Sequence, residues 1–234
     1  RVVVESATDT VVLNADDLHC LRMADFSNAD NICYVTMNSE HTLVKEHIRA
    51  GGRAVVLEKA MNGDMITIYD NGTHMPVLWS HLIPATLEGK AMFNVQNAMF
   101  AAGMAFSFGV DLDNIRHGLR TFDTSFFQAP GRTNVFDEHT FKVILDYAHN
   151  PAAFSAMVDL VDRLDVSGKR IVVASVPGDR RDEDVFEASG ILAGHFDHYI
   201  LKADDNRRKR GNDEIPKMLE QGLLQRNIPA DAIS

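Results

Sequence analysis

The segment 143–151 constrains the fold more than any other part of the chain, because it joins a strand to a helix. It begins with three apolar, mostly β-branched residues, which is typical of a strand covered on both faces. Asn150 can cap the free N–H groups of a helix, and Pro151 suits the first helical position. Asp146 and His149 are therefore predicted at the carboxyl end of a strand, where open α/β sheets bind ligands. A capping aspartate and a packing histidine would give the same pattern, so the spacing alone leaves both roles open.

The alternation of a strand with a helix occurs three times in the second half of the chain. The three predicted units cover residues 141–165, 170–195 and 198–225. Strands that alternate with helices imply a parallel sheet with right-handed crossovers. The preceding segment, 121–131, shows no periodicity and contains a Pro-Gly pair. The sequence thus predicts a boundary near residue 129 between a domain 1–129 and a domain 130–234.

The first predicted domain also mixes strands and helices, so the whole chain is assigned to the α/β class. Its expected strands lie at 11–13, 32–36, 53–57 and 65–69, and its expected helices at 41–50, 94–108 and 112–119. Asn71-Gly72 is a hairpin turn signal, which places a small antiparallel hairpin at the edge of a larger sheet. The helix 94–108 is rich in alanine and methionine, so we expect it to pack closely against a neighbour. Asp16 and Asp17 suit a helix N-terminus better than a ligand site.

Composition excludes several classes of function. The chain has 234 residues, 45% of them hydrophobic, which suffices for one or two domains with apolar cores. Its formal net charge of −10 argues against a nucleic-acid partner or an anionic membrane surface. No long apolar run or signal peptide is present, and Cys20 and Cys33 form no C-x-x-C pair, which favours a cytoplasmic location with reduced thiols. No metal site and no phosphate loop is predicted.

Four motifs carry a resemblance to the Mur ligase superfamily. In chain order they are Asn14-Ala15-Asp16-Asp17, Phe93-Asn94-Val95-Gln96-Asn97-Ala98, Pro130-Gly131-Arg132 and Asp146-Tyr147-Ala148-His149-Asn150-Pro151. Mur ligases use ATP to join a carboxylate to an amine through an acyl phosphate. Four motifs in order, at fitting intervals, are far more specific than any one of them.

Three further segments, 50–55, 178–184 and 202–205, look most like the cyanophycin synthetases. In that family the carboxyl-terminal half resembles a Mur ligase and adds arginine to the aspartate side chains of a poly-aspartate backbone. The resemblance covers essentially the whole chain. It implies that residues 1–129 are the latter part of a Mur ligase central, ATP-binding domain. It also implies that residues 130–234 are the Rossmann-like, mostly parallel carboxyl-terminal lid domain.

The resemblance also implies that the family's phosphate loop and magnesium ligands lie upstream of Asn14. The chain begins at Arg1 without a methionine and ends at Ser234, and both ends look cut from something longer. We therefore expect a fragment that is inactive alone and holds no catalytic residue of its own. The full-length protein is expected to use ATP and Mg²⁺, to act on arginine and a poly-aspartate polymer, and to form a homo-oligomer.

Roles in nucleotide binding follow from the resemblance position by position. Asn94 and Asn97 match the asparagines that hold the adenine, and an amide offers both the donor and the acceptor that adenine requires. Phe93 stands where the family motif has a histidine. Arg132 matches the linker arginine that reaches the ATP phosphates. Asp146 matches the acid that meets the ribose, and His149 its neighbour near the phosphates. Without the resemblance, a helix cap would be the simpler interpretation of Asn94.

The acceptor site is predicted in two charged loops of the second domain. Two acids of the loop 204–210 fall where related ligases bind the incoming amino acid, and two acids of the loop 176–184 are expected beside them. The predicted acceptor residues are Asp179, Asp182, Asp204, Asp205 and Arg207. The acids would form a wall for a cationic amino acid. The alternative is that these acids only solvate the loops or pair with neighbouring arginines.

Two other functions stay open at this point. One is another Mur-type ligase, of the peptidoglycan or folylpolyglutamate kind. The other is a degenerate, non-catalytic Mur-like module that serves assembly or regulation, which Phe93 favours slightly. Arg132, Asp146 and His149 match the family motifs and favour a ligase strongly.

Overall fold

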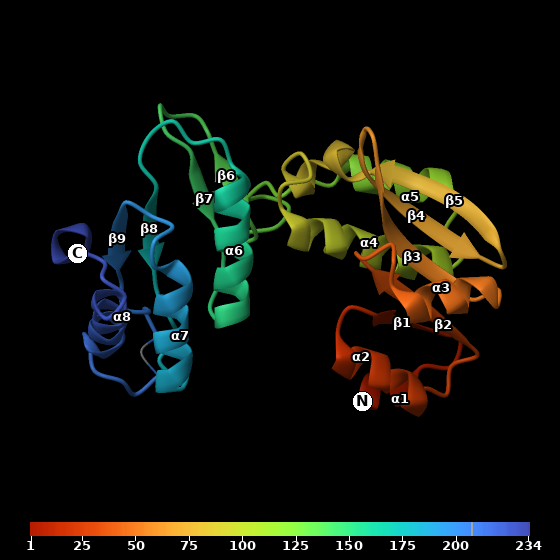
Figure 1. Ribbon diagram of the computed structural model, residues 1–234, viewed down its shortest axis with the longest axis horizontal. Coiled ribbons are helices and arrows are strands. Elements are labelled where there is room, and N and C mark those ends of the chain that lie inside the picture. Colours follow the sequence, from red (N-terminus) through yellow and green to blue (C-terminus); the bar gives the residue numbers. More distant parts are fainter. Residues whose placement is uncertain (207) are drawn as a thin grey trace. The chain divides into compact units, whose positions relative to one another are not determined.

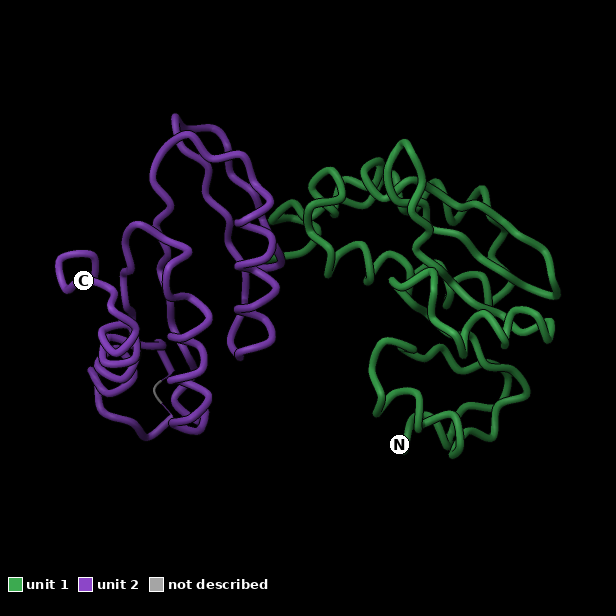
Figure 2. Tube along the Cα trace, in the orientation of Figure 1, with its two compact units in different colours: residues 1–130 green, residues 131–234 purple. Residues whose placement is uncertain are grey.

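The computed structural model describes residues 1–206 and 208–234 and divides the chain into two compact units (Figure 2). Unit 1 is Arg1–Pro130 and unit 2 is Gly131–Ser234. Each unit has its own hydrophobic core and is built from both helices and strands, as the predicted α/β class requires. In the described part of the chain, no helix is both long and apolar enough to cross a membrane.

Unit 1 is a single five-stranded sheet with helices on its two faces (Figure 1). Its elements are α1 (Val2–Ser6), β1 (Thr10–Asn14), α2 (Leu18–Met23), η1 (Ala24–Phe26), β2 (Asn31–Thr36), α3 (Thr42–Arg49), β3 (Arg53–Ala60), β4 (Gly63–Asp70), β5 (Thr73–Trp79), η2 (Ser80–Leu82), η3 (Pro84–Thr86), α4 (Met92–Ser107) and α5 (Leu112–Thr121).

The sheet of unit 1 follows chain order, with β1, β2 and β3 parallel and β3, β4 and β5 antiparallel. The turn between β4 and β5 places Asn71 at φ 47° and Gly72 at φ 75°. Two successive positive φ angles are what a two-residue hairpin turn needs, so the predicted hairpin at the sheet edge is confirmed. Pro76 lies in the edge strand β5, where the missing N–H group does least harm to the ladder.

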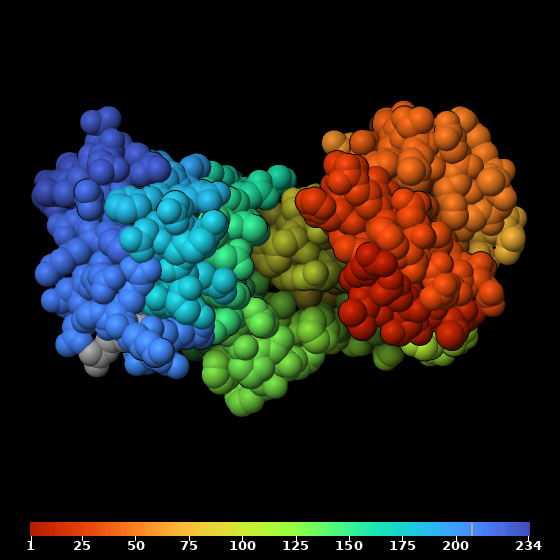
Figure 3. Space-filling view, turned by 90° about the horizontal axis from the view of Figure 1, so that it is seen from below, coloured from red at the N-terminus to blue at the C-terminus, as the bar shows by residue number. Residues whose placement is uncertain are grey.

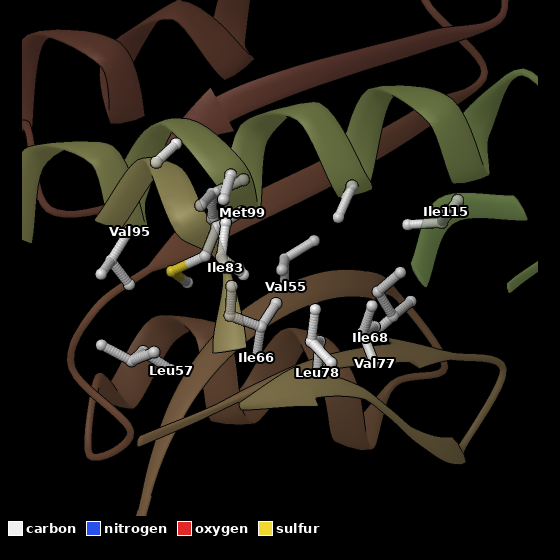
Figure 4. Close-up of a cluster of buried hydrophobic side chains, with 14 of the residues drawn as sticks. Val55, Leu57, Ile66, Ile68, Val77, Leu78, Ile83, Val95, Met99 and Ile115 are labelled. Atoms are coloured by element: carbon white, nitrogen blue, oxygen red, sulfur yellow. The ribbon is translucent and has the colours of Figure 1, made fainter. Parts of the chain in front are cut away.

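The helix α4 packs against one face of this sheet and forms the main core of unit 1 (Figure 4). Val95 and Met99 from the helix meet Val55 from β3, and all three side chains are fully buried. Gly103 lets the helix approach closely, because an added Cβ would lie 3.0 Å from the Val55 Cγ2 atom. Close packing of this alanine-rich helix is therefore confirmed. Gly109, at φ 80°, follows the helix end as predicted.

The opposite face of the sheet carries α3 and a second cluster of buried residues. Val44 of α3 packs with Ala54 and Val56 of β3. Figure 3 shows the N-terminal residues, in red, at the surface of unit 1, where Val2 and Val3 are exposed. Asp17 caps α2 by accepting a hydrogen bond from the Cys20 N–H at 2.8 Å, so the helix interpretation of this acid is confirmed.

Unit 2 holds the three predicted strand-and-helix pairs, preceded by one short strand (Figure 1). Its elements are β6 (Asn134–Phe136), β7 (Val143–Leu145), α6 (Pro151–Arg163), β8 (Ile171–Ala174), α7 (Asp182–Leu192), β9 (His198–Leu201), α8 (Glu214–Leu224) and η4 (Ala230–Ala232). β8 and β9 pair in parallel, and Ile233 continues this ladder with a parallel bridge to Tyr199. β7 instead pairs antiparallel with β6.

The helices α6, α7 and α8 bury their apolar residues in one core together with Tyr199 and Ala174 from the strands. The parallel pairing joins β8 and β9, which form a two-stranded sheet apart from the antiparallel pair of β6 and β7. The prediction that residues 143–145 are covered on both faces was therefore wrong, since Val143 and Leu145 are 41% and 44% exposed. The apolar, mostly β-branched character of residues 143–145 indicated a strand correctly but did not distinguish one covered face from two.

Candidate functional site

The carboxylate of Asp146 joins two of the predicted motifs in unit 2. Its Oδ2 atom accepts hydrogen bonds from the Thr133 N–H at 2.9 Å and from the Thr133 hydroxyl at 3.0 Å. Thr133 is almost fully buried and has a left-handed backbone with φ 51°. The bonds hold the segment before β6 against the end of β7, which puts Arg132 and Asp146 in one place.

Two more hydrogen bonds fix the same junction. The Asn134 side-chain oxygen accepts from the Gly131 N–H at 2.7 Å, and the Gly131 carbonyl accepts from the Tyr147 N–H at 2.8 Å. Gly131 has φ 71°, a conformation that glycine adopts without strain. Thr133 and Asn134 were not predicted as site residues. The sequence did hold one sign of this role, because Asn134 lies three residues after Gly131 and asparagine side chains commonly hydrogen-bond to nearby backbone groups.

Arg132 and His149 both lie against Tyr147. The Arg132 guanidinium is 5.5 Å from the centre of the Tyr147 ring, a cation–π contact, and its side chain is exposed. His149 has its Nδ1 atom 2.9 Å from the Tyr147 carbonyl and its ring 5.0 Å from the tyrosine ring. The structure therefore brings Arg132, Asp146 and His149 together, with Tyr147 between the first and the last.

The helix α6 begins directly after these residues. The Asn150 side chain accepts from the Ala153 N–H at 2.9 Å, and Pro151 occupies the first turn, as predicted. The partial positive charge at a helix N-terminus favours anions nearby. The junction of β7 and α6 therefore presents a guanidinium, a carboxylate, an imidazole and a helix N-terminus, a combination that can bind a phosphorylated ligand bearing hydroxyl groups.

Asn94 and Asn97 lie together in the first turns of α4 in unit 1. The Asn94 amide donates to the Ala85 carbonyl at 2.7 Å and accepts from the Asn97 amide at 3.2 Å. The helix-cap interpretation of Asn94 was wrong, because α4 begins after Ala91 and has no side-chain cap. Asn97 is exposed and Phe93 is half-buried. Asn94 thus positions the Asn97 side chain at the surface.

The predicted acceptor loops of unit 2 meet through ion pairs. Arg208 pairs with Asp179, and this hydrogen bond lowers the pKa of the Asp179 carboxyl. Arg210 pairs with Asp182 at 2.7 Å, and its guanidinium also donates to the Gly178 carbonyl at 2.8 Å. Arg210, which was not predicted, is thus the residue that fixes one loop on the other. The sequence gave no sign of this role, because Arg210 is one of four consecutive basic residues.

The remaining predicted acids use partners within their own loop. Asp205 pairs with Lys202 at 2.8 Å, and this bond lowers the pKa of the aspartate. Asp204 accepts from the Asn206 N–H at 2.8 Å and makes no ion pair in the described part of the chain. Arg207 lies outside the described residues. The four acids are therefore near one another in two loops, but three of them already face a cation of the protein.

No metal-ligand cluster was predicted, and the residues that the structure describes contain no group of three or more His, Cys, Asp or Glu side chains that could hold a metal ion. Burial raises the pKa of the Cys33 thiol to about 12, so this cysteine stays a neutral core residue at physiological pH.

Comparisons with known proteins cover both units. Residues 131–232 match the family model for the Mur ligase, glutamate ligase domain. The cyanophycin synthetase of Nostoc sp. is 42% identical over 214 residues, which is 92% of this chain and 23% of that protein. The chain thus spans about a quarter of the length of the curated cyanophycin synthetases that it matches.

Solved structures share the fold over nearly the whole chain. The UDP-N-acetylmuramoylalanyl-D-glutamyl-2,6-diaminopimelate–D-alanyl-D-alanyl ligase of Acinetobacter baumannii superposes with a TM-score of 0.58 at 16% identity, covering 96% of this chain and 41% of that one. The folylpolyglutamate synthase of Mycobacterium tuberculosis, complexed with ADP, gives a TM-score of 0.56 at 18% identity, covering 96% and 52%. The motif-based resemblance to the Mur-ligase-like part of the cyanophycin synthetases is therefore confirmed, and nearly all of unit 2 matches the Mur ligase, glutamate ligase domain family model.

Proposed function

We propose that this chain is part of an ATP-dependent ligase of the cyanophycin synthetase type, which adds arginine to the aspartate side chains of a poly-aspartate backbone. In this reaction a side-chain carboxylate attacks the γ-phosphorus of ATP, which forms an acyl phosphate and releases ADP. The arginine amine then attacks the acyl carbon and phosphate leaves. The identity to cyanophycin synthetases over 92% of the chain supports this assignment.

We assign unit 1 to the latter part of the central, ATP-binding domain and unit 2 to the carboxyl-terminal domain. On the basis of the family resemblance, we assign the Mg²⁺ ligands to a part of the protein upstream of Asn14. The full-length enzyme would act as a homo-oligomer, and the chain alone would not turn over substrate.

In unit 2, Arg132 would bind the phosphates of ATP, His149 would lie near them, and Asp146 would accept a hydrogen bond from a ribose hydroxyl. The observation that carries this proposal is the pair of hydrogen bonds from Thr133 to Asp146. They hold the Asp146 carboxylate in place at the N-terminus of α6, next to the backbone of Arg132, before any ligand arrives, which reduces the cost of ordering this group on binding.

In unit 1, the Asn94 and Asn97 amides would hold the adenine edge. The Asn94 amide is fixed by Ala85, and it accepts from Asn97, so the exposed Asn97 amide is the better placed of the two to contact a base. Phe93 offers an aromatic ring where the family motif has a histidine, which replaces a polar contact by an apolar one.

For the site of the incoming arginine, we propose the acidic wall of Asp179, Asp182, Asp204 and Asp205, together with Arg207. Asp204 is the strongest member, because it makes no ion pair among the described residues. Asp179, Asp182 and Asp205 pair with protein cations, so an incoming guanidinium would have to exchange with these cations. Exchange of one solvent-accessible ion pair for another costs little, because water screens both pairs.

The second candidate is another Mur-type ligase, favoured by the folds of the Acinetobacter ligase and the folylpolyglutamate synthase. These proteins are 16–18% identical to the chain, whereas the cyanophycin synthetases are 36–42% identical, so the second candidate is weaker. A non-catalytic module is weaker still, since Arg132, Asp146 and His149 are all present and held together.

The proposal is tested by arginine incorporation into a poly-aspartate primer by the full-length enzyme. We expect Arg132→Ala to lower ATP-dependent incorporation by about 100-fold, the usual cost of removing a charge-stabilising group. Arg163→Ala is the matched control, because it removes an exposed arginine that, in the described part of the chain, pairs with Asp159 of the same helix. Equal activity of the two variants would contradict the nucleotide role of Arg132. Incorporation of a different amino acid by the unmodified enzyme would favour the second candidate.

A further inference from the structure

Unit 1 contains a cleft of about 510 Å³ on the outer part of its antiparallel strands. The lining comes from the ends of β3, β4 and β5 and from the start of α3. The cleft is lined by Ser39, Glu40, Lys45, Glu58, Lys59, Ala60, Met65, Tyr69, His74, Pro76 and Trp79. This face of the sheet is opposite to the face that packs on α4, which carries Asn94 and Asn97.

The cleft exists because α3 covers only the first part of β3. Ala54 and Val56 lie under Val44 of the helix and are buried. Glu58 is the next residue of β3 on the same face, and its register partner is Met65 of β4. Met65 in turn pairs with Trp79 of β5. A carboxylate and an aromatic ring thus share one uncovered face of the sheet.

Glu58 is held by three neighbouring side chains. Its Oε2 atom accepts from the Thr67 hydroxyl at 2.6 Å and lies 3.1 Å from His74 Nε2, and its Oε1 atom accepts from the Tyr69 hydroxyl. Burial raises the pKa of Glu58, but these three hydrogen bonds outweigh it and lower the pKa below its ordinary value. The side chain is 28% exposed, so an ionised carboxylate stands in the cleft in a fixed orientation.

No lysine or arginine of the described chain neutralises this carboxylate. Lys45, the lysine of α3 in the cleft wall, is paired with Glu40 at 2.5 Å. Among the residues that the structure describes, His74 is the ion-pair partner of Glu58, and Lys59, which also lines the cleft, forms no ion pair with it. A carboxylate has about four lone-pair positions, of which Thr67, Tyr69 and His74 use three. One acceptor position of the carboxylate is therefore left for a ligand.

We propose that this cleft binds an organic cation of the guanidinium class, with Glu58 as its counter-ion and Trp79 as the aromatic surface against which it stacks. A planar guanidinium can donate to a carboxylate and stack on an aromatic ring at the same time, which a compact ammonium does less well. The lining of the cleft includes none of the predicted nucleotide or acceptor residues. It does not depend on the proposed ligase function, although an arginine-bearing polymer would supply such a ligand.

Trp79 reports on the cleft directly, because it is the single tryptophan of the chain. The 234-residue chain would be titrated with arginine and, separately, with citrulline, which has the same shape but a neutral ureido group. We expect a saturable change of tryptophan fluorescence with arginine that weakens as salt is added, and little change with citrulline. Lysine is expected to bind more weakly than arginine. Equal responses to arginine and citrulline, or no saturable response to arginine, would overturn the proposal.

A matched pair of variants locates the site. Glu58→Gln removes the charge but keeps the size, and we expect it to weaken arginine binding about tenfold or more, since hydrogen bonds to charged groups are the stronger ones. Glu46→Gln removes an exposed carboxylate of α3 outside the cleft lining and should leave binding unchanged. Unchanged binding in Glu58→Gln would contradict the assignment. The comparison of arginine with citrulline needs no variant, so it decides the matter even if Glu58→Gln fails to fold. The binding assay does not measure ligation, so its result is independent of whether the proposed ligase function is correct.

Discussion

At the scale of single residues, the nucleotide-site candidates depend on a strained position that the sequence did not reveal. Thr133 is β-branched and has φ 51°, a conformation that costs about 1–3 kcal/mol. The two hydrogen bonds to Asp146 offset this cost. The motif order predicted Asp146, but the bond to Thr133 spans 13 residues of chain and depends on how β6 and β7 pair. Local sequence patterns carry no information on such a contact.

The first prediction separates the structural and functional roles of Asp146. Asp146→Ala should destabilise unit 2 by about 1–3 kcal/mol, because it removes the acceptor of both Thr133 bonds. Asp146→Asn keeps an acceptor oxygen and should unfold close to the unmodified chain in urea. In the full-length enzyme both variants should lose arginine incorporation, since the charge is gone in both. Full activity of Asp146→Asn would show that the carboxylate charge does not serve the reaction.

The second prediction concerns the buried thiol of Cys33. Burial raises its pKa in the folded chain to about 12, whereas a thiol in the unfolded chain ionises near about 8.5. Above this lower value the unfolded state binds fewer protons, so the free energy of unfolding should fall as the pH rises, by up to about 1.4 kcal/mol per pH unit.

Urea unfolding between about pH 8 and about pH 10 measures this effect. Cys33→Ala should flatten the dependence on pH, whereas Cys20→Ser, at a partly exposed thiol, should change it less. The same slope in Cys33→Ala and the unmodified chain would contradict the assignment to Cys33.

At the scale of elements, periodicity predicted most helices and strands because their burial is one-sided. The helices α4, α6 and α8 and the hairpin of β4 and β5 all form near their predicted positions. The short strand β6 was missed, since three residues are too few to show a period. The antiparallel pairing of β7 with β6 was missed for the same reason. Which face each strand leaves open depends on the direction of the crossovers, which is a property of the whole sheet.

The third prediction compares two glycines in helices of unit 1. Replacing a helical glycine by alanine gains about 1 kcal/mol of helix propensity. Gly118 in α5 has open space around it, so Gly118→Ala should stabilise the unit by about this amount. At Gly103 in α4 the new methyl group would lie 3.0 Å from Val55 Cγ2 and 3.5 Å from Cys33 Sγ. Overpacking typically costs about 1–3 kcal/mol, so Gly103→Ala should be neutral or destabilising. Equal stabilisation by both changes in thermal unfolding would show that α4 does not pack as closely as described.

At the scale of the whole molecule, the two units differ in what the sequence could predict. The nucleotide candidates come from motif order, and in unit 2 the structure gathers Arg132, Asp146 and His149 as one group. The cleft around Glu58 had no motif, because its residues come from four elements and share only a face of the sheet. In the acceptor loops, charge alone could not distinguish an acidic wall from internal ion pairs, since each of the four acids lies within two residues of a lysine or arginine.

The fourth prediction is that the two units unfold independently. The buried cores of Arg1–Pro130 and Gly131–Ser234 contain separate sets of residues, and a unit with its own core can fold as a unit. Leu219 is fully buried in the core of unit 2, and Met99 is fully buried in that of unit 1. Leu219→Ala and Met99→Ala should each cost about 2–5 kcal/mol. In calorimetry, each change should lower the melting temperature of one transition only. A single transition that both variants shift would mean that the cores unfold together, and residues 131–234 expressed alone would then fail to fold.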